Sequence, residues 1–290
     1  MKLSIYYRGS LASCNYACNY CPFSKRRDTR KQLSRDRVAL QRFVGWAKDA
    51  SSYHLGILFT PWGEALIRPA YQNAMIELSQ CAHVWKVAIQ TNLSCSLKWI
   101  DACRIDHIGL WSTFHPTEVP VSRFVKKVHW LRERGVSISV GVVGKREHFS
   151  VIKKLREQLP GDVYLWINAY KGPGGGYEAN ELKQLSAIDP LLPIDYERHH
   201  SKERACSAGE ASIAVDATGA MRRCHFVEAP IGNIYQEGWN AAFIPRLCPN
   251  ADCNCFLGYS QLTHLAVGER FGDGILERNG ERWLEKFANR

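Results

Sequence analysis

Three cysteines stand close together near the amino end of the chain, at Cys14, Cys18 and Cys21, with the spacing C-x3-C-x2-C. Thiolates bind iron and zinc, and thiolates packed this densely in one loop can converge on one metal centre. A centre with four protein ligands is closed, whereas three ligands leave one position open for a substrate or cofactor. The spacing therefore predicts a metal centre that carries out chemistry.

The stretch that holds these cysteines reads Cys-Asn-Tyr-Ala-Cys-Asn-Tyr-Cys, with Tyr20 just before the last one. It resembles the signature of the radical S-adenosylmethionine (radical SAM) enzymes. The resemblance implies that Cys14, Cys18 and Cys21 hold a [4Fe-4S] cluster whose fourth iron chelates SAM, also written AdoMet. It further implies reductive cleavage of SAM to a 5'-deoxyadenosyl radical, with Tyr20 against the adenine. A zinc site or a partial structural cluster is the alternative for these thiols.

A second group of cysteines lies past residue 205: Cys206, Cys224, Cys248, Cys253 and Cys255. Residues 212–215 and 220–223 alternate like strands around a glycine-containing turn at Gly219, which predicts a hairpin that brings the first two together. The pattern C-x12-G-x4-C resembles the start of the SPASM and twitch extensions of radical SAM enzymes, and residues 232–234 match its continuation.

The resemblance implies one auxiliary [4Fe-4S] cluster on Cys206, Cys224 and two of the remaining three cysteines. Cys253 and Cys255 are so close in sequence that we expect strain if both bind one cluster, in which case Cys248 completes the set. A zinc site remains open, because thiolates alone do not select the metal.

The whole chain has 290 residues, of which eleven are cysteine. No apolar run approaches the ~20 residues of a membrane span. The amino end enters a strand-like pattern at once, so we expect neither a secretory signal nor a separate leader-binding domain. In the cytoplasm, where we expect this protein, thiols stay reduced, which favours metal binding over disulfides. Outside the two groups, Cys81, Cys95 and Cys103 are expected to be ordinary small apolar residues.

The formal charge is +10, from 38 basic and 28 acidic side chains. Much of it falls within residues 25–37, directly after the cysteine loop. A basic face can steer an anionic substrate, an acidic peptide or an acidic electron donor, here a flavodoxin- or ferredoxin-like protein. The alternative function is a non-catalytic zinc or iron–sulfur protein that binds nucleic acid through this face, but no nucleic-acid-binding module accompanies the charge.

Strand-like and helix-like segments alternate over the first ~170 residues, which predicts a parallel sheet with right-handed crossovers. The expected strands are residues 2–7, 54–60, 85–91, 105–112, 136–143 and 163–168. The expected helices are residues 34–48, 69–81, 96–102, 122–134 and 148–158. Six units are too few for a closed eightfold barrel and fit the partial (β/α)6 TIM-like barrel of radical SAM enzymes. In such barrels, active-site residues sit at the carboxyl ends of the strands.

Two strand ends carry residues that resemble SAM-contacting motifs. After the second strand, Gly63 and Glu64 match part of the Gly-Gly-Glu-Pro motif of the superfamily, although Trp62 and Ala65 depart from it. The resemblance implies that Glu64 accepts the SAM ammonium. After the third strand, Asn92 belongs to a Thr-Asn turn and lines the site or caps the turn.

The remaining strand ends give four further candidates. Ser112 is placed to meet the SAM ribose or carboxylate, and His115 is a candidate acid or base toward the substrate. Gly141 could let the backbone approach the adenine. Asn168 ends the sixth strand and precedes a glycine-rich exit from the barrel.

We expect four parts: a radical SAM barrel over residues 1–176, a linker over 177–205, a small twitch/SPASM-like auxiliary cluster domain over 206–258, and closing helices over 259–290. The linker holds two adjacent histidines, residues 199 and 200, which we expect in a solvated loop. The predicted function is SAM cleavage followed by hydrogen abstraction from a peptide or small natural product, with the auxiliary cluster assisting oxidation.

Overall fold

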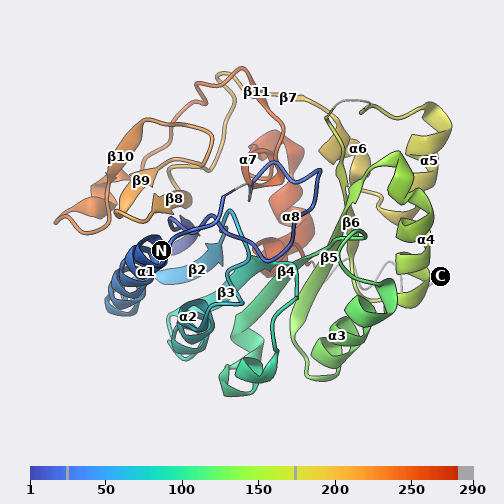
Figure 1. The fold of residues 1–290 in the computed structure, drawn as a ribbon. Helices are drawn as coiled ribbons and strands as arrows, with labels where there is room; N and C mark the ends of the chain where they lie inside the picture. The colour runs from blue at the N-terminus through green and yellow to red at the C-terminus, as the bar shows by residue number, and fades with distance from the viewer. Residues whose placement is uncertain (24–25, 173–174, 280–290) are drawn as a thin grey trace.

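The computed structural model describes residues 1–23, 26–172 and 175–279 (Figure 1). Six strands run parallel and lie side by side in sequence order. They are β1 (Lys2–Arg8), β2 (His54–Phe59), β3 (Val84–Thr91), β4 (Ile108–Phe114), β5 (Ser137–Gly144) and β6 (Leu165–Ala169). The prediction of an α/β fold with a large parallel sheet is confirmed, because every crossover between these strands adds the next strand to the same edge.

Helices between the strands pack on one side of the sheet, which we call the outer face (Figure 1). They are α1 (Arg30–Asp49), α2 (Pro69–Ser79), α3 (Val121–Glu133) and α4 (Phe149–Gln158). The first helix begins before residue 34, because Thr29 accepts a hydrogen bond from the backbone of Gln32 and the Gln32 side chain accepts one from the backbone of Thr29. Such a capping box fixes the start of a helix. None of the helices in the described part of the chain is long and apolar enough to cross a membrane.

Short 3-10 helices complete the connections. They are η1 (Lys98–Ala102), η2 (Ile105–His107), η3 (Arg146–His148), η4 (Trp239–Ala242), η5 (Thr263–Leu265) and η6 (Gly272–Ile275). Two of them replace expected regular structure, since residues 96–102 were predicted as an α-helix and residues 105–107 as the start of a strand.

The opposite side of the sheet, the inner face, packs against the carboxyl-terminal part of the chain (Figure 1). Its strands contribute the buried side chains Tyr6, Leu58, Ala88, Trp111 and Trp166. The segments that cover them include α7 (Phe256–Tyr259) and α8 (Val267–Phe271). Of residues 259–290, where we predicted closing helices, the structure has α8 and two short 3-10 helices, and residues 280–290 lie outside the described residues.

The hairpin predicted between the first two cysteines of the second group is present. It consists of β8 (Ser212–Asp216) and β9 (Ala220–Arg222), and β10 (Pro230–Asn233) pairs with β9. Its turn uses Gly219 with φ +82°, a conformation that glycine adopts without cost. Strand β8 pairs in parallel with β1, so the hairpin extends the main sheet to nine strands.

The segment predicted as a linker is folded. It contains α5 (Ala179–Ile188), α6 (Leu192–Tyr196) and β7 (His199–His200), and β7 pairs antiparallel with β11 (Asp252–Cys253). The prediction of a solvated loop at the two histidines is wrong for His199, which is buried with its Nε2 2.7 Å from the Ile194 carbonyl oxygen. This small ribbon ties the middle of the chain to the second cysteine group.

Candidate functional site

The loop that carries the first three cysteines leaves the carboxyl end of β1, and a buried carboxylate on α1 fixes its first turn. Asp36 Oδ1 accepts hydrogen bonds from the backbone N–H of Ser10 at 2.8 Å and of Leu11 at 2.9 Å, while Tyr71 Oη donates to Asp36 Oδ2 at 3.0 Å. The Ser10 hydroxyl also donates to Asp36 Oδ1, at 3.2 Å. A buried acceptor with four donors holds a loop in one shape, because releasing it would leave a buried charge unpaired. Asp36 was not among the residues predicted from the sequence. The available signal was a single acidic residue between Arg35 and Arg37, within an otherwise basic stretch.

A second carboxylate holds the next two residues of the loop. Asp28 Oδ2 accepts from the backbone N–H of Ala12 at 2.9 Å and of Ser13 at 2.8 Å, and from the Ser13 hydroxyl at 2.7 Å. These hydrogen bonds lower the pKa of Asp28 against the effect of burial. The backbone is therefore positioned right up to Cys14.

The three thiols lie near enough to influence one another. The backbone N–H of Tyr16 donates to Cys14 Sγ at 3.4 Å. Burial raises the pKa of Cys14, and it raises that of Cys18 to about 11; the charge of Cys21 acts in the same direction on both. Metal binding releases such protons, because the thiolate is the ligand.

No group of three or more His, Cys, Asp or Glu side chains in the described residues converges as it would around a single metal ion. A cubane cluster makes a different demand, since each cysteine binds a separate iron and the sulfurs stay apart. Three thiols on one anchored loop fit that demand, whereas the side-chain ligands of a zinc site converge on one ion.

The ends of β2 and β3 are joined behind the loop by Glu64. This side chain is buried; its Oε1 accepts from Thr91 Oγ1 at 2.8 Å and its Oε2 from the backbone N–H of Asn92 at 2.6 Å. Burial raises the pKa of Glu64 to about 7, and the hydrogen bonds oppose that rise. The candidate acceptor for an ammonium group is thus held beside the cysteine loop.

Two neighbours of Glu64 explain how closely the strand ends approach the cysteines. A Cβ atom at Gly63 would overlap the carbonyl oxygen of Ser13, so only glycine allows this contact. Asn92 Nδ2 lies 3.7 Å from Cys14 Sγ and donates to Asn15 Oδ1 at 3.2 Å. The structure therefore brings together the cysteine loop, Gly63 and Asn92, as the sequence pattern predicted.

His115 and Tyr20 also meet at the loop. His115 Nδ1 lies 3.2 Å from Cys18 Sγ and 3.1 Å from Tyr20 Oη, and the two rings are stacked with centroids 6.0 Å apart. Burial lowers the pKa of His115 to about 4, so the ring is neutral near pH 7. His115 therefore contacts Cys18, one of the three predicted cluster ligands. Its role as an acid or base toward the substrate stays a prediction.

The other three strand-end candidates have different surroundings. Ser112 is fully buried and its hydroxyl donates to the Ser139 carbonyl at 2.6 Å. A Cβ atom at Gly141 would overlap the indole of Trp166, its register partner on β6, so this glycine makes room for that ring. Asn168 is exposed at the end of β6. Their contacts with a cofactor stay predictions.

The five later cysteines are linked by electrostatic interactions between their thiols. The pKa of Cys224 is raised by burial and by the charges of Cys206 and Cys248. Burial raises the pKa of Cys253 to about 12, and Cys224, Cys255 and Cys248 add to the rise. The thiol of Cys253 approaches the backbone at Gly258, where a Cβ atom would overlap it.

Cys255 has other surroundings. The charges that act on its thiol are those of Asp195, Arg8 and Arg278, and desolvation by the surrounding protein raises its pKa. Arg8 lies on β1, and Arg278 packs against the ring of Phe256, the residue after Cys255. Cys255 thus lies near these charged groups as well as near Cys253, whose pKa it raises.

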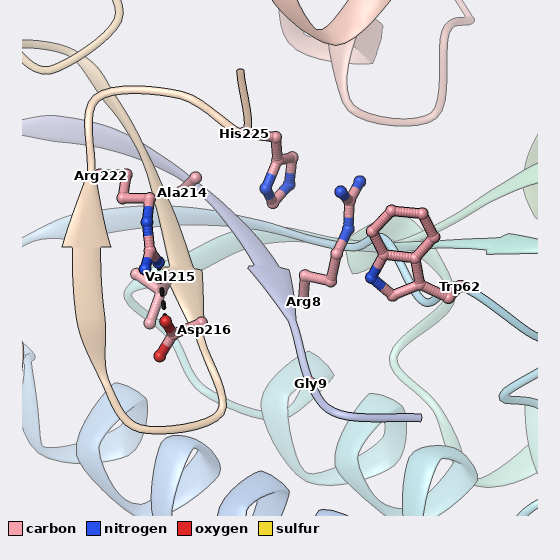
Figure 2. A pocket seen from close by; sticks show the side chains of 8 residues that line it. All are labelled: Arg8, Gly9, Trp62, Ala214, Val215, Asp216, Arg222 and His225. Carbon is pink, nitrogen blue, oxygen red and sulfur yellow. Dashed lines mark hydrogen bonds and ion pairs between the residues drawn. The ribbon is translucent and has the colours of Figure 1, made fainter. Parts of the chain in front are cut away.

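A cavity of about 240 Å³ lies between the end of β1 and the β8–β9 hairpin, and its lining includes His225, the residue after Cys224 (Figure 2). Arg8 projects into it, 4.9 Å from the ring of Trp62, and its Nε donates to the Thr60 carbonyl at 2.9 Å. Burial lowers the pKa of Arg8 to about 10. His225 Nε2 lies 3.0 Å from Thr60 Oγ1, and burial with nearby arginines lowers its pKa to about 3.

The basic stretch after the cysteine loop is exposed at Arg26, Arg27, Arg30, Lys31, Arg35 and Arg37. Residue 25 lies outside the described residues. Two exposed aromatic rings, Phe23 and Trp62, stand next to it with centroids 5.0 Å apart. The cysteine loop therefore opens beside a cationic surface with an aromatic edge.

No protein-family model matches the chain, and a search of curated proteins finds no match by sequence. Solved structures do match. Native anSMEcpe with bound AdoMet and Kp18Cys peptide is 13% identical, with TM-score 0.55 and 100% of both chains covered. Native anSMEcpe with bound AdoMet and Cp18Cys peptide is 14% identical, with TM-score 0.54 and 100% of both chains covered. Native anSMEcpe with bound AdoMet alone is 14% identical, with TM-score 0.52 and 83% of both chains covered. At these identities the likeness establishes the fold.

Proposed function

We propose that this protein is a radical SAM enzyme. One observation carries the proposal: the C-x3-C-x2-C loop stands at the carboxyl end of β1 in a fold shared with structures that bind AdoMet. Glu64 and Asn92, from the next two strand ends, lie beside that loop. Strand ends of a parallel sheet are where such folds bind ligands. We also propose that the six parallel strands form the partial (β/α)6 barrel.

Each residue of the site then has a task. Cys14, Cys18 and Cys21 would hold a [4Fe-4S] cluster, which together with SAM supplies a 5'-deoxyadenosyl radical for hydrogen abstraction. The Glu64 carboxylate would accept hydrogen bonds from the SAM ammonium, a charge-assisted contact in a dry site. Tyr20 would lie against the adenine. Asp28 and Asp36 would keep the loop in position, so that SAM and substrate meet in a fixed geometry.

The second group would hold one auxiliary [4Fe-4S] cluster. We assign it to Cys206, Cys224, Cys248 and Cys253, because Cys206 and Cys248 act on Cys224, and Cys224 and Cys248 act on Cys253. We leave Cys255 out, because it is so close to Cys253 in sequence that we expect strain if both bind one cluster. This assignment makes residues 206–258 a twitch-like unit beside the barrel of residues 1–176. Its cluster would take an electron from the substrate radical and so assist an oxidation.

For a substrate we propose a peptide or a small natural product. Two of the similar solved structures carry a bound peptide with AdoMet. For the electron donor we propose an acidic flavodoxin- or ferredoxin-like protein, because the exposed arginines beside the cysteine loop form a cationic surface that would attract it. We propose that the enzyme acts in the cytoplasm, where thiols stay reduced.

Anaerobic reconstitution tests the function. The loaded protein should hold about eight irons, four for each cubane, and should release 5'-deoxyadenosine from SAM after reduction. Added SAM should change the electron paramagnetic resonance spectrum of the reduced protein, because it binds an iron directly. Zinc without SAM cleavage would contradict the proposal and favour a non-catalytic, nucleic-acid-binding metal protein instead.

A further inference from the structure

The cavity of about 240 Å³ between the end of β1 and the β8–β9 hairpin is walled by segments far apart in the sequence (Figure 2). Arg8 and Gly9, which lead into the cysteine loop, belong to its lining, as does Trp62 from the loop after β2. His225, the residue after Cys224, lines it as well. The cavity therefore lies between a segment that leads into the first cysteine group and a segment that follows a cysteine of the second.

Arg8 offers hydrogen-bond donors to this cavity. Its side chain is half-buried, its Nε donates to the Thr60 carbonyl at 2.9 Å, and its guanidinium carbon lies 4.9 Å from the ring centroid of Trp62. Within the part of the chain that the structure describes, no carboxylate reaches ion-pair distance of Arg8, and its two terminal nitrogens have no acceptor. The guanidinium is thus held at its base, while the outer side of its donor fork is free to meet a ligand.

The second arginine of the lining is already paired. Arg222 Nη1 donates to Asp216 Oδ2 at 2.7 Å, and Arg222 Nε donates to the Glu228 carbonyl at 3.0 Å. Asp216 Oδ1 in turn accepts from the backbone N–H of Thr218 at 2.8 Å. Arg222 and Asp216 compensate each other, so Arg8 supplies the one uncompensated charge among the arginine and aspartate side chains of this lining.

The rest of the lining determines what can accompany an anion. Gly9, Ala214 and Val215 contribute small or apolar surface, and the ring of Trp62, which is 43% exposed, adds an aromatic wall. His225 is a further polar group, with its Nε2 3.0 Å from Thr60 Oγ1. A mostly apolar lining with one placed charge is typical of sites that orient a small molecule by a single charged group.

The loop after β2 connects this cavity with the predicted SAM site. Thr60 and Trp62 contact Arg8. The next two residues of the loop contact other strand ends, since Gly63 packs on the backbone of the cysteine loop and Glu64 accepts hydrogen bonds from the end of β3. A group bound at Arg8 would therefore be separated from the predicted ammonium acceptor by a few residues of one loop.

We propose that Arg8 forms, within this cavity, a subsite for a carboxylate group of the substrate. The planar fork of a guanidinium pairs with a carboxylate through two parallel hydrogen bonds. A single uncompensated cation balances one negative charge, whereas a phosphate dianion would keep an unbalanced charge near Asp216. The inference deepens the proposed function, on which it rests, by naming a substrate class: peptides or small molecules that carry a free carboxyl group.

Paired binding of benzoate and benzamide tests the subsite without knowledge of the substrate. The two molecules are alike in size and shape, but only benzoate carries a negative charge. Saturation-transfer NMR titrations against the anaerobically reconstituted full-length protein give the two dissociation constants, and their ratio cancels the contribution of the shared ring. R8Q removes the proposed partner. R37Q, which removes an exposed arginine on α1, is the matched control.

Benzoate should bind about tenfold more tightly than benzamide to the wild type and to R37Q, as expected for one charge-assisted pairing. R8Q should reduce this preference to within about twofold. R8K keeps the charge but loses the planar fork, so it should keep a preference of about threefold. D216N removes a negative charge from the lining and should raise the preference above the wild-type value. Should R8Q fail to fold, R8K and D216N still test the proposal, because they change the preference in opposite directions.

Equal affinities of the wild type for benzoate and benzamide would overturn the proposal, as would a preference that is as large in R8Q as in R37Q. Displacement of benzoate by SAM would overturn it too, by assigning Arg8 to the carboxylate of the cofactor. So would stronger competition by inorganic phosphate than by acetate. The titration requires neither reduction nor SAM cleavage: a protein that shows the preference but cannot cleave SAM would refute the proposed enzyme and leave the carboxylate subsite standing.

Discussion

The first cysteine region lies within residues 14–21, whereas the second draws its thiols from residues 206–255. The first is a single loop, fixed by hydrogen bonds from its own backbone to Asp28 and Asp36. The second depends on pairings between distant segments, namely β8 with β1 and β7 with β11. Local hydrogen bonds therefore position the first group of cysteines, whereas pairing between strands far apart in the sequence positions the second.

The difference has a functional counterpart. Three thiols on a loop leave one iron position open, whereas four thiols close a centre. The open region stands beside Glu64 and Asn92, which are suited to hold a cofactor. The second group would form a closed centre under the proposed assignment, and Cys224 directly precedes His225, which lines the cavity together with Arg8 (Figure 2). We expect substitutions in the two regions to separate the steps of the reaction.

The largest effect should come from the open region. C18A should lower SAM cleavage at least about a thousandfold, because a cluster with two protein ligands cannot be held in a geometry that binds the cofactor. Release of 5'-deoxyadenosine after reduction measures it. C103A is the matched control, since this cysteine is expected to be an ordinary apolar residue, and its activity should stay near the wild-type level. Cleavage by C18A at the C103A rate would contradict the ligand assignment.

The next effect should come from the closed region and sharpens the comparison directly. C224A should reduce the bound iron from about eight to about four while SAM cleavage persists, because only the auxiliary cluster is lost. C255A, in the same segment of the chain, should keep about eight. Iron analysis together with 5'-deoxyadenosine release distinguishes the two. Iron loss in C255A, with full iron in a C248A variant, would show that Cys255 and not Cys248 completes the set.

The anchoring of the first loop can be weakened without touching a cysteine. D36N should destabilise the protein by about 2 kcal/mol, because an amide accepts fewer of the four hydrogen bonds that now reach this carboxylate. Chemical denaturation measures the change, and the loop should also lose iron faster on exposure to a chelator. D49N, at the exposed end of the same helix, should change neither. If D36N retained its iron as D49N does, the loop would not depend on this anchor.

The smallest effect that we expect is a change of stability with pH, which comes from the buried carboxyl group of Asp189. Burial raises the pKa of Asp189 from 3.8 to about 6, so its ionisation costs folding free energy. The folded state binds the Asp189 proton more tightly than the unfolded state does. The folding stability that this proton contributes is therefore complete below the pKa of the unfolded state, and it is lost as pH rises through the pKa of the folded state. Between about pH 5 and about pH 7 the wild type should lose about 1 kcal/mol relative to D189N. Parallel pH profiles of unfolding free energy for the two proteins would contradict this.

Residues that act through short-range spacing were predictable. The three-cysteine loop, the Gly63–Glu64 pair and the turn at Asn92 each follow a predicted strand, and parallel strands bring their carboxyl ends to one edge. The six strands were found in order, because β-branched and apolar runs separated by amphipathic helices admit few other arrangements. The hairpin turn at Gly219 was found because its alternation is local.

Side-chain direction was harder to predict. Ser112 was chosen at the end of β4, yet its hydroxyl donates to the backbone at Ser139, and Thr113 shares the inner face with Trp111. A strand period of two means that an error of one residue moves a side chain to the opposite face. The direction in which Gly141 faces was equally hard to predict. Because this residue has no side chain, the ring of Trp166 fits against its backbone.

The sequence by itself determined the alternation of strands and helices, the open three-thiol loop and the presence of a second cysteine group, because each is written in residues near one another along the chain. Only the tertiary structure decided that β8 joins β1, that Arg8 and Asp195 act on the Cys255 thiol, and that Arg278 is buried against the rings of Phe256 and Trp166. These features arise from contacts between residues far apart in sequence, which no local pattern records.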